Sequence, residues 1–158
     1  MESQEIGTNS VVQKLKDWDA KAVAEVIEFR GETTVVVPQS HLLRTAEYLA
    51  TEPTLRFTFL SDITTVDRFP IEPRFELNYE LLSLERQQRL RLRVRLPGSE
   101  ASAPSVTSVW PTANWHEREN FDLFGVRFTG HPDLTRILLP DEWEGHPLRK
   151  DYPVEGFR

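Results

Sequence analysis

The stretch from Trp115 to Leu139 contains the residues of this chain whose types and spacing could do chemistry. Within about two helical turns it places a histidine, an arginine and three carboxylates: His116, Glu117, Arg118, Glu119 and Asp122. Carboxylates beside a histidine could act as a general acid and base, or could bind a metal ion. Charges at this spacing can instead be satisfied by a network inside the fold, or they can face another protein.

A metal site of the zincin type needs two histidines four residues apart on one face of a helix. The sequence has Asn120 in the second of these positions, so His116 lacks this partner. His131 and His146 each precede a proline, in segments that we expect to be loops. We therefore favour hydrogen-bonding roles for the histidines. A small metal-dependent hydrolase that uses His116, His131 and nearby carboxylates is the alternative.

The composition limits the classes of function. The 158 residues fit one domain, and the net charge of −6 argues against general nucleic-acid binding. The absence of cysteine excludes disulfides, thiolate zinc sites and cysteine-ligated iron–sulfur clusters in this chain. The glycines are too far apart for a phosphate-binding loop. Without an apolar membrane span or a signal peptide, we expect a cytosolic protein, or one held at a membrane by a partner.

The elements that must position the charged stretch follow from the hydrophobic pattern. The pattern first predicts a mobile tail over residues 1–8, a helix from Asn9 or Ser10 through Trp18, and a segment Ala22–Phe29 that fits either a helix or a strand. It then predicts a strand over Thr33–Val37, a helix capped by Ser40 and ending near Glu52, and a strand over Leu55–Val66 with Phe57 and Phe59 on one face.

Two segments of alternating polarity follow, Arg74–Leu84 and Arg89–Leu96, and their short connection predicts an antiparallel pair. The second segment carries an arginine stripe on its polar face, namely Arg89, Arg91, Arg93 and Arg95. Such a stripe could bind RNA. However, Glu76 and Glu80 on the neighbouring strand can pair with it across the ladder, so we favour a salt-bridged solvent face.

The charged stretch itself is predicted to begin on a helix over Ala113–Phe124, after a loop from Pro97 to Pro104 and a short helix over Ser105–Trp110. The longer helix brings Trp115, Arg118, Phe121 and Asp122 to one face. Prolines interrupt the chain beyond Pro132 and leave almost no apolar pattern. We expect this last part to be disordered, or to lie extended against something larger.

The charged stretch resembles a known family signature. Its parts are Glu117-Arg118-Glu119, Asp122, Leu123-Phe124, His131 and Ile137-Leu138. They resemble the signature of the C subunit, also called the 30-kilodalton subunit, of bacterial NADH:quinone oxidoreductase (respiratory complex I). Similar blocks flank it at Phe57–Asp62, Arg74–Glu76, Pro104–Thr107, Trp110-Pro111, Asn114-Trp115 and Gly145–Pro153. Thr135 departs from the family pattern, which usually has a basic residue or proline there, and the neighbouring Arg136 could replace it.

The resemblance implies an α+β fold. We expect a compact two-layer domain with a mixed, largely antiparallel sheet packed by helices, followed by an extended C-terminal tail. In this sequence the parts would be the mobile tail over residues 1–8, one domain over residues 9–139, and a docking tail over residues 140–158. The resemblance also favours a strand for Ala22–Phe29.

The resemblance further implies a non-catalytic structural subunit in the peripheral arm of a proton-translocating NADH:quinone oxidoreductase. Such a subunit would pack on the D subunit, the large subunit that helps form the quinone site, with the B and I subunits nearby. It would lie on the cytoplasmic side of the inner membrane and touch the membrane only through the complex. It would bind no cofactor, and FMN, iron–sulfur clusters and quinone would be held by partner subunits. The alternative is an equivalent scaffold subunit of a related membrane-bound hydrogenase or other quinone reductase.

Under this interpretation the chain has no catalytic, cofactor-binding or metal-binding residue, and its signature forms a structural or interface network. The residues that we expect in this network or at the partner interface are Trp115, Glu117, Arg118, Glu119, Asp122, Gly125, His131, Pro132, Arg149, Lys150, Asp151 and Tyr152.

Overall fold

The computed structural model describes residues 2–157, and for residues 2–9 it describes the backbone alone. A five-stranded sheet forms the centre, with strands in the order β1-β2-β5-β4-β3. The strands are β1 (Glu25–Phe29), β2 (Glu32–Val36), β3 (Phe59–Asp67), β4 (Phe75–Ser83) and β5 (Gln88–Leu96). Only β2 and β5 pair in parallel within this sheet. The sheet is therefore mixed and largely antiparallel, as predicted.

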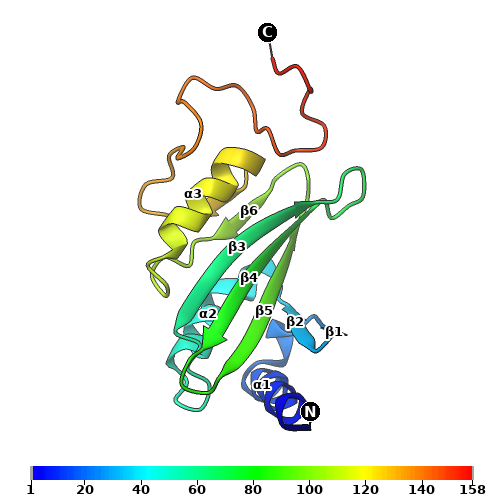
Figure 1. Ribbon diagram of the computed structural model, residues 1–158, viewed down its shortest axis with the longest axis vertical. Coiled ribbons are helices and arrows are strands. Elements are labelled where there is room, and N and C mark those ends of the chain that lie inside the picture. The colour runs from blue at the N-terminus through cyan, green and yellow to red at the C-terminus, as the bar shows by residue number, and fades with distance from the viewer. Residues whose placement is uncertain (1, 158) are drawn as a thin grey trace.

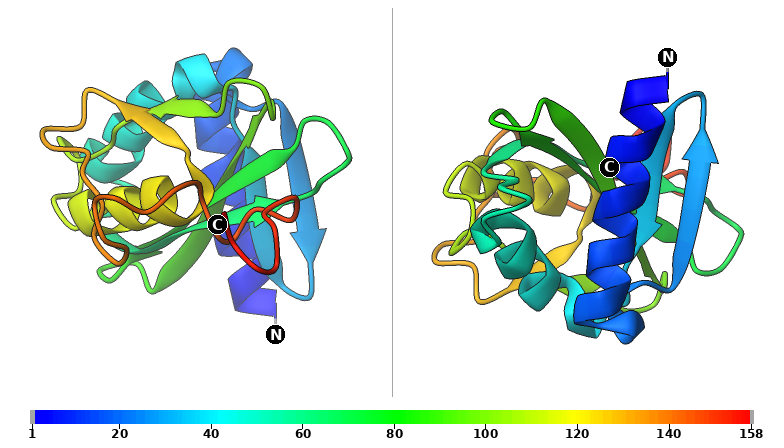
Figure 2. Two further views of the ribbon diagram at one scale, coloured as in Figure 1. Left: turned by 90° about the horizontal axis from the view of Figure 1, so that it is seen from above. Right: turned by 90° about the horizontal axis from the view of Figure 1, so that it is seen from below.

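Helices pack on one face of this sheet and at its edge (Figures 1 and 2). They are α1 (Glu2–Trp18), α2 (Leu42–Thr51) and α3 (Ala113–Phe124), with short 3-10 helices η1 (Ala20–Ala22) and η2 (Gln39–His41). A parallel two-stranded ladder joins β6 (Ser102–Pro104) to β7 (Arg127–Thr129). After β7 the chain has no further helix or strand up to residue 157, and it folds back over the end of α3 (Figure 1). The predicted α+β class and the extended tail are both confirmed.

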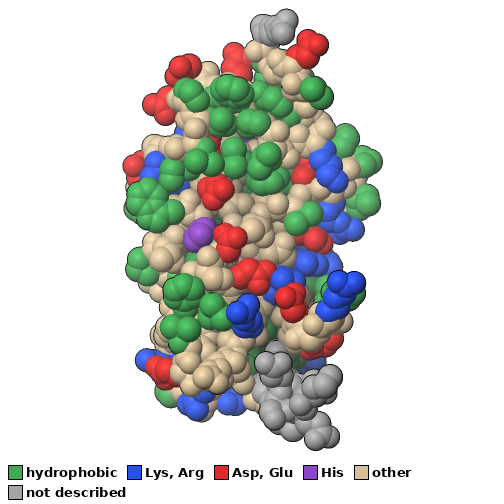
Figure 3. Space-filling model, viewed as in Figure 1, with side chains coloured by type: hydrophobic (Ala, Val, Ile, Leu, Met, Phe, Trp, Pro, Cys, Tyr) green, Lys and Arg blue, Asp and Glu red, His purple; other side chains and the backbone are tan. Residues whose placement is uncertain are grey.

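The core lies between α1, α2 and the inward face of the sheet. Alternation along β4 buries Leu77, Tyr79 and Leu81, and Leu15 and Leu49 pack on the same cluster from α1 and α2. The opposite face of the sheet carries the arginine stripe, which pairs with carboxylates: Arg91 with Glu80 and Glu32, Arg93 with Glu76, and Arg95 with Glu76 and Glu25. Figure 3 shows these mixed charges on the face that no helix covers. The predicted salt-bridged face is confirmed.

Several predicted elements have different bounds. The first helix begins at Glu2, so the predicted cap at Asn9 or Ser10 is wrong, and most of the segment predicted as a mobile tail is helical. Ser40 does not cap α2, because residues 39–41 form the 3-10 turn η2 and the helix begins at Leu42. Ala22–Phe29 contains β1, as the family resemblance indicated, after the 3-10 turn that ends at Ala22.

The predicted strand over Leu55–Val66 begins only at Phe59. Arg56 adopts a positive φ of 55°, and the N–H of Phe57 donates to the carbonyl of Leu49, so this segment caps the end of α2 rather than extending the sheet. Phe57 is fully buried whereas Phe59 is 44% exposed, so the prediction that they share one face is wrong.

Two predictions around the predicted loop before α3 also differ from the structure. Part of the predicted loop over Pro97–Pro104 forms β6. The predicted helix over Ser105–Trp110 is a turn. The N–H of Val106 and the hydroxyl of Ser105 both donate to the carboxylate of Glu117, which ties this turn to the following helix.

Candidate functional site

Helix α3 has the predicted bounds and divides the signature residues into two groups. Glu117, Asn120 and Asp122 are buried on it, whereas Trp115 and Glu119 are exposed. Gly125 ends the helix with a φ of +73°, and its N–H donates to the carbonyl of Phe121. A side chain at Gly125 would also collide with His146 and Arg149, because a Cβ there would lie 2.5 and 2.6 Å from their atoms. The helix end and the tail therefore need glycine at this position.

Asp122 holds the segment after β7 on the helix. Its carboxylate accepts hydrogen bonds from three successive backbone N–H groups, those of Ile137, Leu138 and Leu139, at 3.1, 2.7 and 2.9 Å. The guanidinium of Arg136 pairs with it at 2.7 Å. Burial alone raises the pKa of the Asp122 carboxyl, but these hydrogen bonds outweigh burial and hold the pKa below its ordinary value. A carboxylate with this many donors acts as an anchor.

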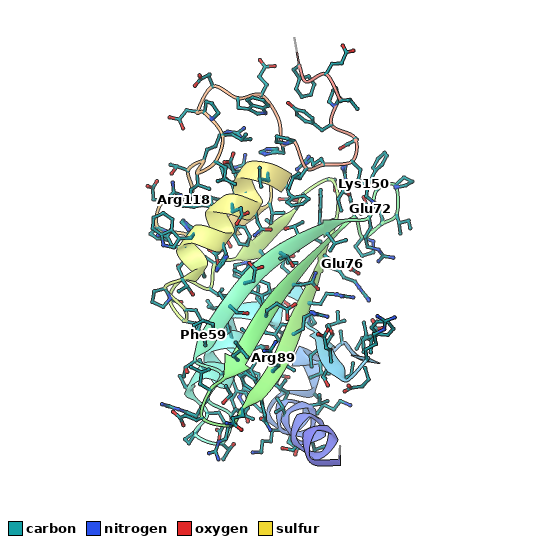
Figure 4. All side chains as sticks on the ribbon, viewed as in Figure 1. Phe59, Glu72, Glu76, Arg89, Arg118 and Lys150 are labelled. Atoms are coloured by element: carbon teal, nitrogen blue, oxygen red, sulfur yellow. The ribbon has the colours of Figure 1, made fainter. Side chains whose placement is uncertain are left out.

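Arg118 binds the same segment from the next turn of the helix. Its Nε donates to the carbonyl of Thr135 at 3.1 Å and its Nη2 to the carbonyl of Arg136 at 3.0 Å, while its guanidinium lies 5.5 Å from the ring centroid of Trp115. It projects from the side of α3 that faces away from the sheet (Figure 4). Because the contact at Thr135 is to a backbone carbonyl, the departure from the family pattern at this position does not remove it.

Glu117 lies at the centre of a buried polar cluster. Its carboxyl accepts hydrogen bonds from the N–H of Val106 and the hydroxyl of Ser105, both at 2.7 Å. Burial raises the pKa of Glu117 to about 7, against the opposing effect of these two bonds. The hydroxyl of Tyr79 is buried without a hydrogen-bond partner among the described residues. Burial and the neighbouring Glu117 raise the pKa of Tyr79.

His131 lies against this cluster. Its side chain is fully buried and its Nε2 is 3.9 Å from the carboxylate of Glu117. Its Nδ1 accepts a hydrogen bond from the N–H of Asp133, so the neutral ring carries its proton on Nε2, which lies 3.3 Å from the carbonyl of Asn114. The neighbouring Pro132 is exposed. His131 therefore has a hydrogen-bonding role within the fold.

The tail is fastened by a second cluster around Arg74, which lies where β4 begins. Arg74 forms paired hydrogen bonds with Asp67 at 2.8 Å and with Asp151 at 2.6 and 3.0 Å. The backbone N–H of Lys150 donates to Asp67 at 2.8 Å. The hydrogen bonds with Arg74 hold the pKa of Asp151 below its ordinary value. The hydrogen bonds with Asp67 and Asp151 raise the pKa of Arg74. This cluster joins residues that lie more than 70 positions apart in the sequence.

The remaining tail residues lie on either side of this cluster. Arg149 donates to the carbonyl of Phe124 at 2.6 Å, at the end of α3, and burial lowers its pKa. Lys150 is exposed. The hydroxyl of Tyr152 donates to the carbonyl of Glu144 at 3.3 Å, and its ring meets that of Phe157 edge to face. The predicted residues 149–152 thus gather at one end of the molecule, close to α3.

Sequence reasoning missed several residues of these clusters. Asn120, noted only because it is not histidine, joins α3 to β3 through a bond from its Nδ2 to the carbonyl of Ile63 at 2.7 Å. Asp67 supplies the charge opposite Arg74, and Arg136, noted only as the neighbour of Thr135, supplies the charge opposite Asp122. Their partners are distant in sequence or lie in a segment without periodicity, so no local pattern could have paired them.

The alternative of a metal-dependent hydrolase finds no support in the geometry. His116 pairs with Asp62 on β3 at 3.2 Å, whereas His131 points toward Glu117 and Asn114. Among the side chains of residues 10–157, no group of three or more histidine, aspartate or glutamate residues could hold a metal ion. None of the helices within residues 2–157 is long and apolar enough to cross a membrane.

An apolar surface adjoins the two clusters. Large hydrophobic side chains are exposed on α3 and along the tail: Trp115, Leu138, Trp143, Leu148, Val154 and Phe157. Figure 3 shows apolar side chains gathered over the end of the molecule that the tail forms. Exposed apolar side chains concentrated at one end are typical of a protein interaction surface.

Comparisons with known proteins agree with this geometry. Among curated proteins, the chain is 46% identical over 145 residues to the C subunit of NADH-quinone oxidoreductase from a Roseiflexus species, covering 92% of this chain and 83% of that protein. It is 45% identical over 149 residues to the same subunit of Geobacter sulfurreducens, covering 94% of this chain and 91% of that protein.

Two solved structures share the fold. The trypsin-resistant fragment (1–134) of Nqo5 superposes with a TM-score of 0.67 at 35% identity, covering 78% of this chain and 98% of the fragment. A chain of the membrane-bound sulfane sulfur reductase, an archaeal respiratory membrane complex, superposes with a TM-score of 0.79 at 25% identity, covering 94% of this chain and 86% of that chain. The family model described as the 30 Kd subunit of respiratory-chain NADH dehydrogenase matches residues 35–158. The chain therefore belongs to this 30 Kd subunit family of respiratory complex I.

Proposed function

We propose that the chain is a structural subunit in the peripheral arm of a proton-translocating NADH:quinone oxidoreductase. The observation that carries this proposal is that the signature side chains bind groups within the chain itself. Asp122 and Arg118 bind backbone groups of the chain's own tail, and Glu117 is enclosed in the fold. These side chains fix a shape rather than face a substrate, while apolar side chains beside them remain exposed.

The exposed apolar surface at the tail end is the proposed contact with neighbouring subunits. Following the family resemblance, we assign the main contact to the D subunit near the quinone-site module, with the B and I subunits nearby. Residues 140–158 would act as the docking tail. The complex would hold the chain on the cytoplasmic side of the inner membrane.

Electron carriers are assigned to the neighbours. The chain has no cysteine to ligate an iron–sulfur cluster, and FMN, the clusters and quinone would bind to partner subunits. The chain would support electron transfer from NADH to quinone by holding those partners in place.

Deletion of the gene in its native host tests this function. Membranes without the chain should lose NADH-dependent quinone reduction that is coupled to a membrane potential, and the full-length chain supplied in trans should restore it. Coupled NADH oxidation at the wild-type rate in membranes without the chain would contradict the proposal.

A second candidate is the equivalent subunit of a related membrane complex with another electron donor. The specific observation in its favour is the shared fold with the sulfane sulfur reductase chain, over 94% of this chain. Activity measurements on the membranes of the deletion strain distinguish the two candidate functions. A loss of activity confined to a hydrogen- or sulfur-dependent reaction, with NADH oxidation intact, would support this second candidate.

A further inference from the structure

A groove lies between α3 and the edge strand β3, on a different side of the helix from the Arg118 contacts. Its volume is about 290 Å³. This volume lies at the lower end of the roughly 300–1,000 Å³ that ligand pockets usually have, so the groove has room for one long side chain from another protein.

The walls of the groove are held in place by bonds within the chain. The Asn120 amide bridges α3 to the carbonyl of Ile63 on β3, which fixes the distance between helix and strand. The N–H of Leu148 donates to the carbonyl of Leu123 at 3.0 Å, which holds the tail at the end of the groove. Because these contacts already exist in the isolated chain, a partner would meet a preformed site.

The groove combines an apolar floor with carboxylates. Leu123 and Phe124 are half-buried in it, and Leu148 remains 52% exposed beside them. Asp62 on β3 and Glu119 on α3 also line it, and none of the lining residues is basic. Asp62 lies 3.2 Å from the Nδ1 of His116, but its side chain remains 48% exposed. Glu119 is exposed and forms no ion pair with another described residue, so it is the main carboxylate open to a partner.

We infer that this groove receives an arginine or lysine side chain from a neighbouring subunit. The aliphatic stem of that side chain would lie on Leu123, Phe124 and Leu148, and its charged head would reach Asp62 and Glu119. Long basic side chains combine an apolar stem with a charged end in this way, and complementary charge orients subunits as they associate. The inference rests on the proposed function, because it requires a neighbouring subunit.

Charge variants test the chemistry of the occupant. Full-length chains with Glu119→Gln and Glu119→Arg are produced in the native host, and the amount retained in the affinity-purified membrane complex is measured over a salt series. We expect retention to fall by about tenfold for Glu119→Arg, since like charges facing each other oppose association, and by less for Glu119→Gln. Glu47→Arg is the matched control, because Glu47 is exposed on α2, which contributes no residue to the groove.

Occupancy is tested separately with Thr64→Cys, which introduces the only thiol of this chain into the groove. Maleimide should label this thiol at least about tenfold more slowly in the complex than in the isolated full-length chain. Retention of Glu119→Arg in the complex at the wild-type level would overturn the inference. If the thiol of Thr64→Cys were nevertheless protected in the complex, the occupant of the groove would be apolar. Equal labelling in both states would also overturn it. Absence of the wild-type chain from every membrane complex would overturn the proposed function itself.

Discussion

Glu117 couples the stability of the fold to pH. Its pKa is about 7 in the folded chain, because of burial, against an ordinary value of 4.5. The folded state therefore keeps the proton to a higher pH than the unfolded chain does. The free energy of unfolding should fall as pH rises from about 4.5 to about 7 and should stay lower above that, by an amount on the order of 3 kcal/mol.

Glu117→Gln isolates this effect. The amide can donate to Ser105 and accept from Val106 without ionising, so the variant should match the wild type below the ordinary pKa of 4.5 and exceed it at pH 8 by up to about 3 kcal/mol. His146 changes the free energy of unfolding with pH in the opposite direction. Burial lowers its pKa, so the unfolded chain takes up a proton on this residue more readily than the folded chain does, and stability rises with pH. Urea unfolding gives the free energy for the wild type and for Glu117→Gln at each pH, and the difference between the two proteins cancels the contribution of His146. Parallel pH dependence of both proteins would contradict the assignment.

Asp122 should carry more stability than other carboxylates of the same region. Asp122→Asn removes the charge that binds Arg136 and three backbone N–H groups, and breaking a buried pair in this way costs about 3–5 kcal/mol. Asp133→Asn is the control, since Asp133 is exposed. Urea unfolding gives the free energies, and hydrogen exchange at the amides of residues 137–139 should accelerate only in Asp122→Asn. Equal stability of both variants would show that the anchor is not needed.

At the scale of elements, the Arg74 cluster decides whether the tail stays on the domain. The side chain of Asp67 is only 2% exposed, whereas that of Asp151 is 44% exposed. Asp151→Ala should therefore release the tail with little loss of overall stability, and Arg74→Ala should also destabilise the domain by about 3–5 kcal/mol, because it leaves Asp67 buried and unpaired.

Limited trypsin digestion measures this release. Cleavage after Arg149 and Lys150 should be several-fold faster in Asp151→Ala than in the wild type, because local opening controls access to the bond. Glu155→Ala is the control, since Glu155 is an exposed residue of the same tail. Cleavage at the wild-type rate in Asp151→Ala would show that other contacts hold the tail.

The elements that can be predicted from the sequence are those with a strong local period. The alternation in β4 and β5 and the helix α3 are predicted correctly, since each buries one regular face. The segment from Leu55 to Thr58 and the turn at Ser105–Trp110 are not, because their backbone is fixed by distant groups. In the first segment the N–H of Phe57 donates to the carbonyl of Leu49, and in the second the N–H of Val106 donates to the carboxylate of Glu117. Local pattern contains no information about such partners.

The same limit applies to the candidate site. The signature identifies α3 and residues 149–152, and the structure brings them to one end of the molecule. It does not indicate that Asp122 binds the backbone of residues 137–139, or that Asp67 and Arg74 receive Asp151. Each of these contacts reaches a partner in the tail, which has no periodicity, so only the folded arrangement reveals them.

At the scale of the whole molecule, charge and apolar surface are separated. The open sheet face pairs three of the four arginines of its stripe, Arg91, Arg93 and Arg95, with carboxylates of the same chain, so it has little unpaired charge to attract nucleic acid. Of the twelve large hydrophobic side chains that are exposed among residues 10–157, six lie on α3 and the tail, and Phe69 lies beside Arg74, which holds the tail. This separation leaves one end of the molecule suited to burial against neighbouring subunits.

Native mass spectrometry of the solubilised membrane complex tests the central claim most directly. With a tag on the full-length chain, we expect one assembly in which this chain and NADH-oxidising subunits are present in equal numbers. Recovery of the chain as a monomer, or in an assembly without NADH-oxidising subunits, would contradict a role in NADH:quinone oxidoreductase.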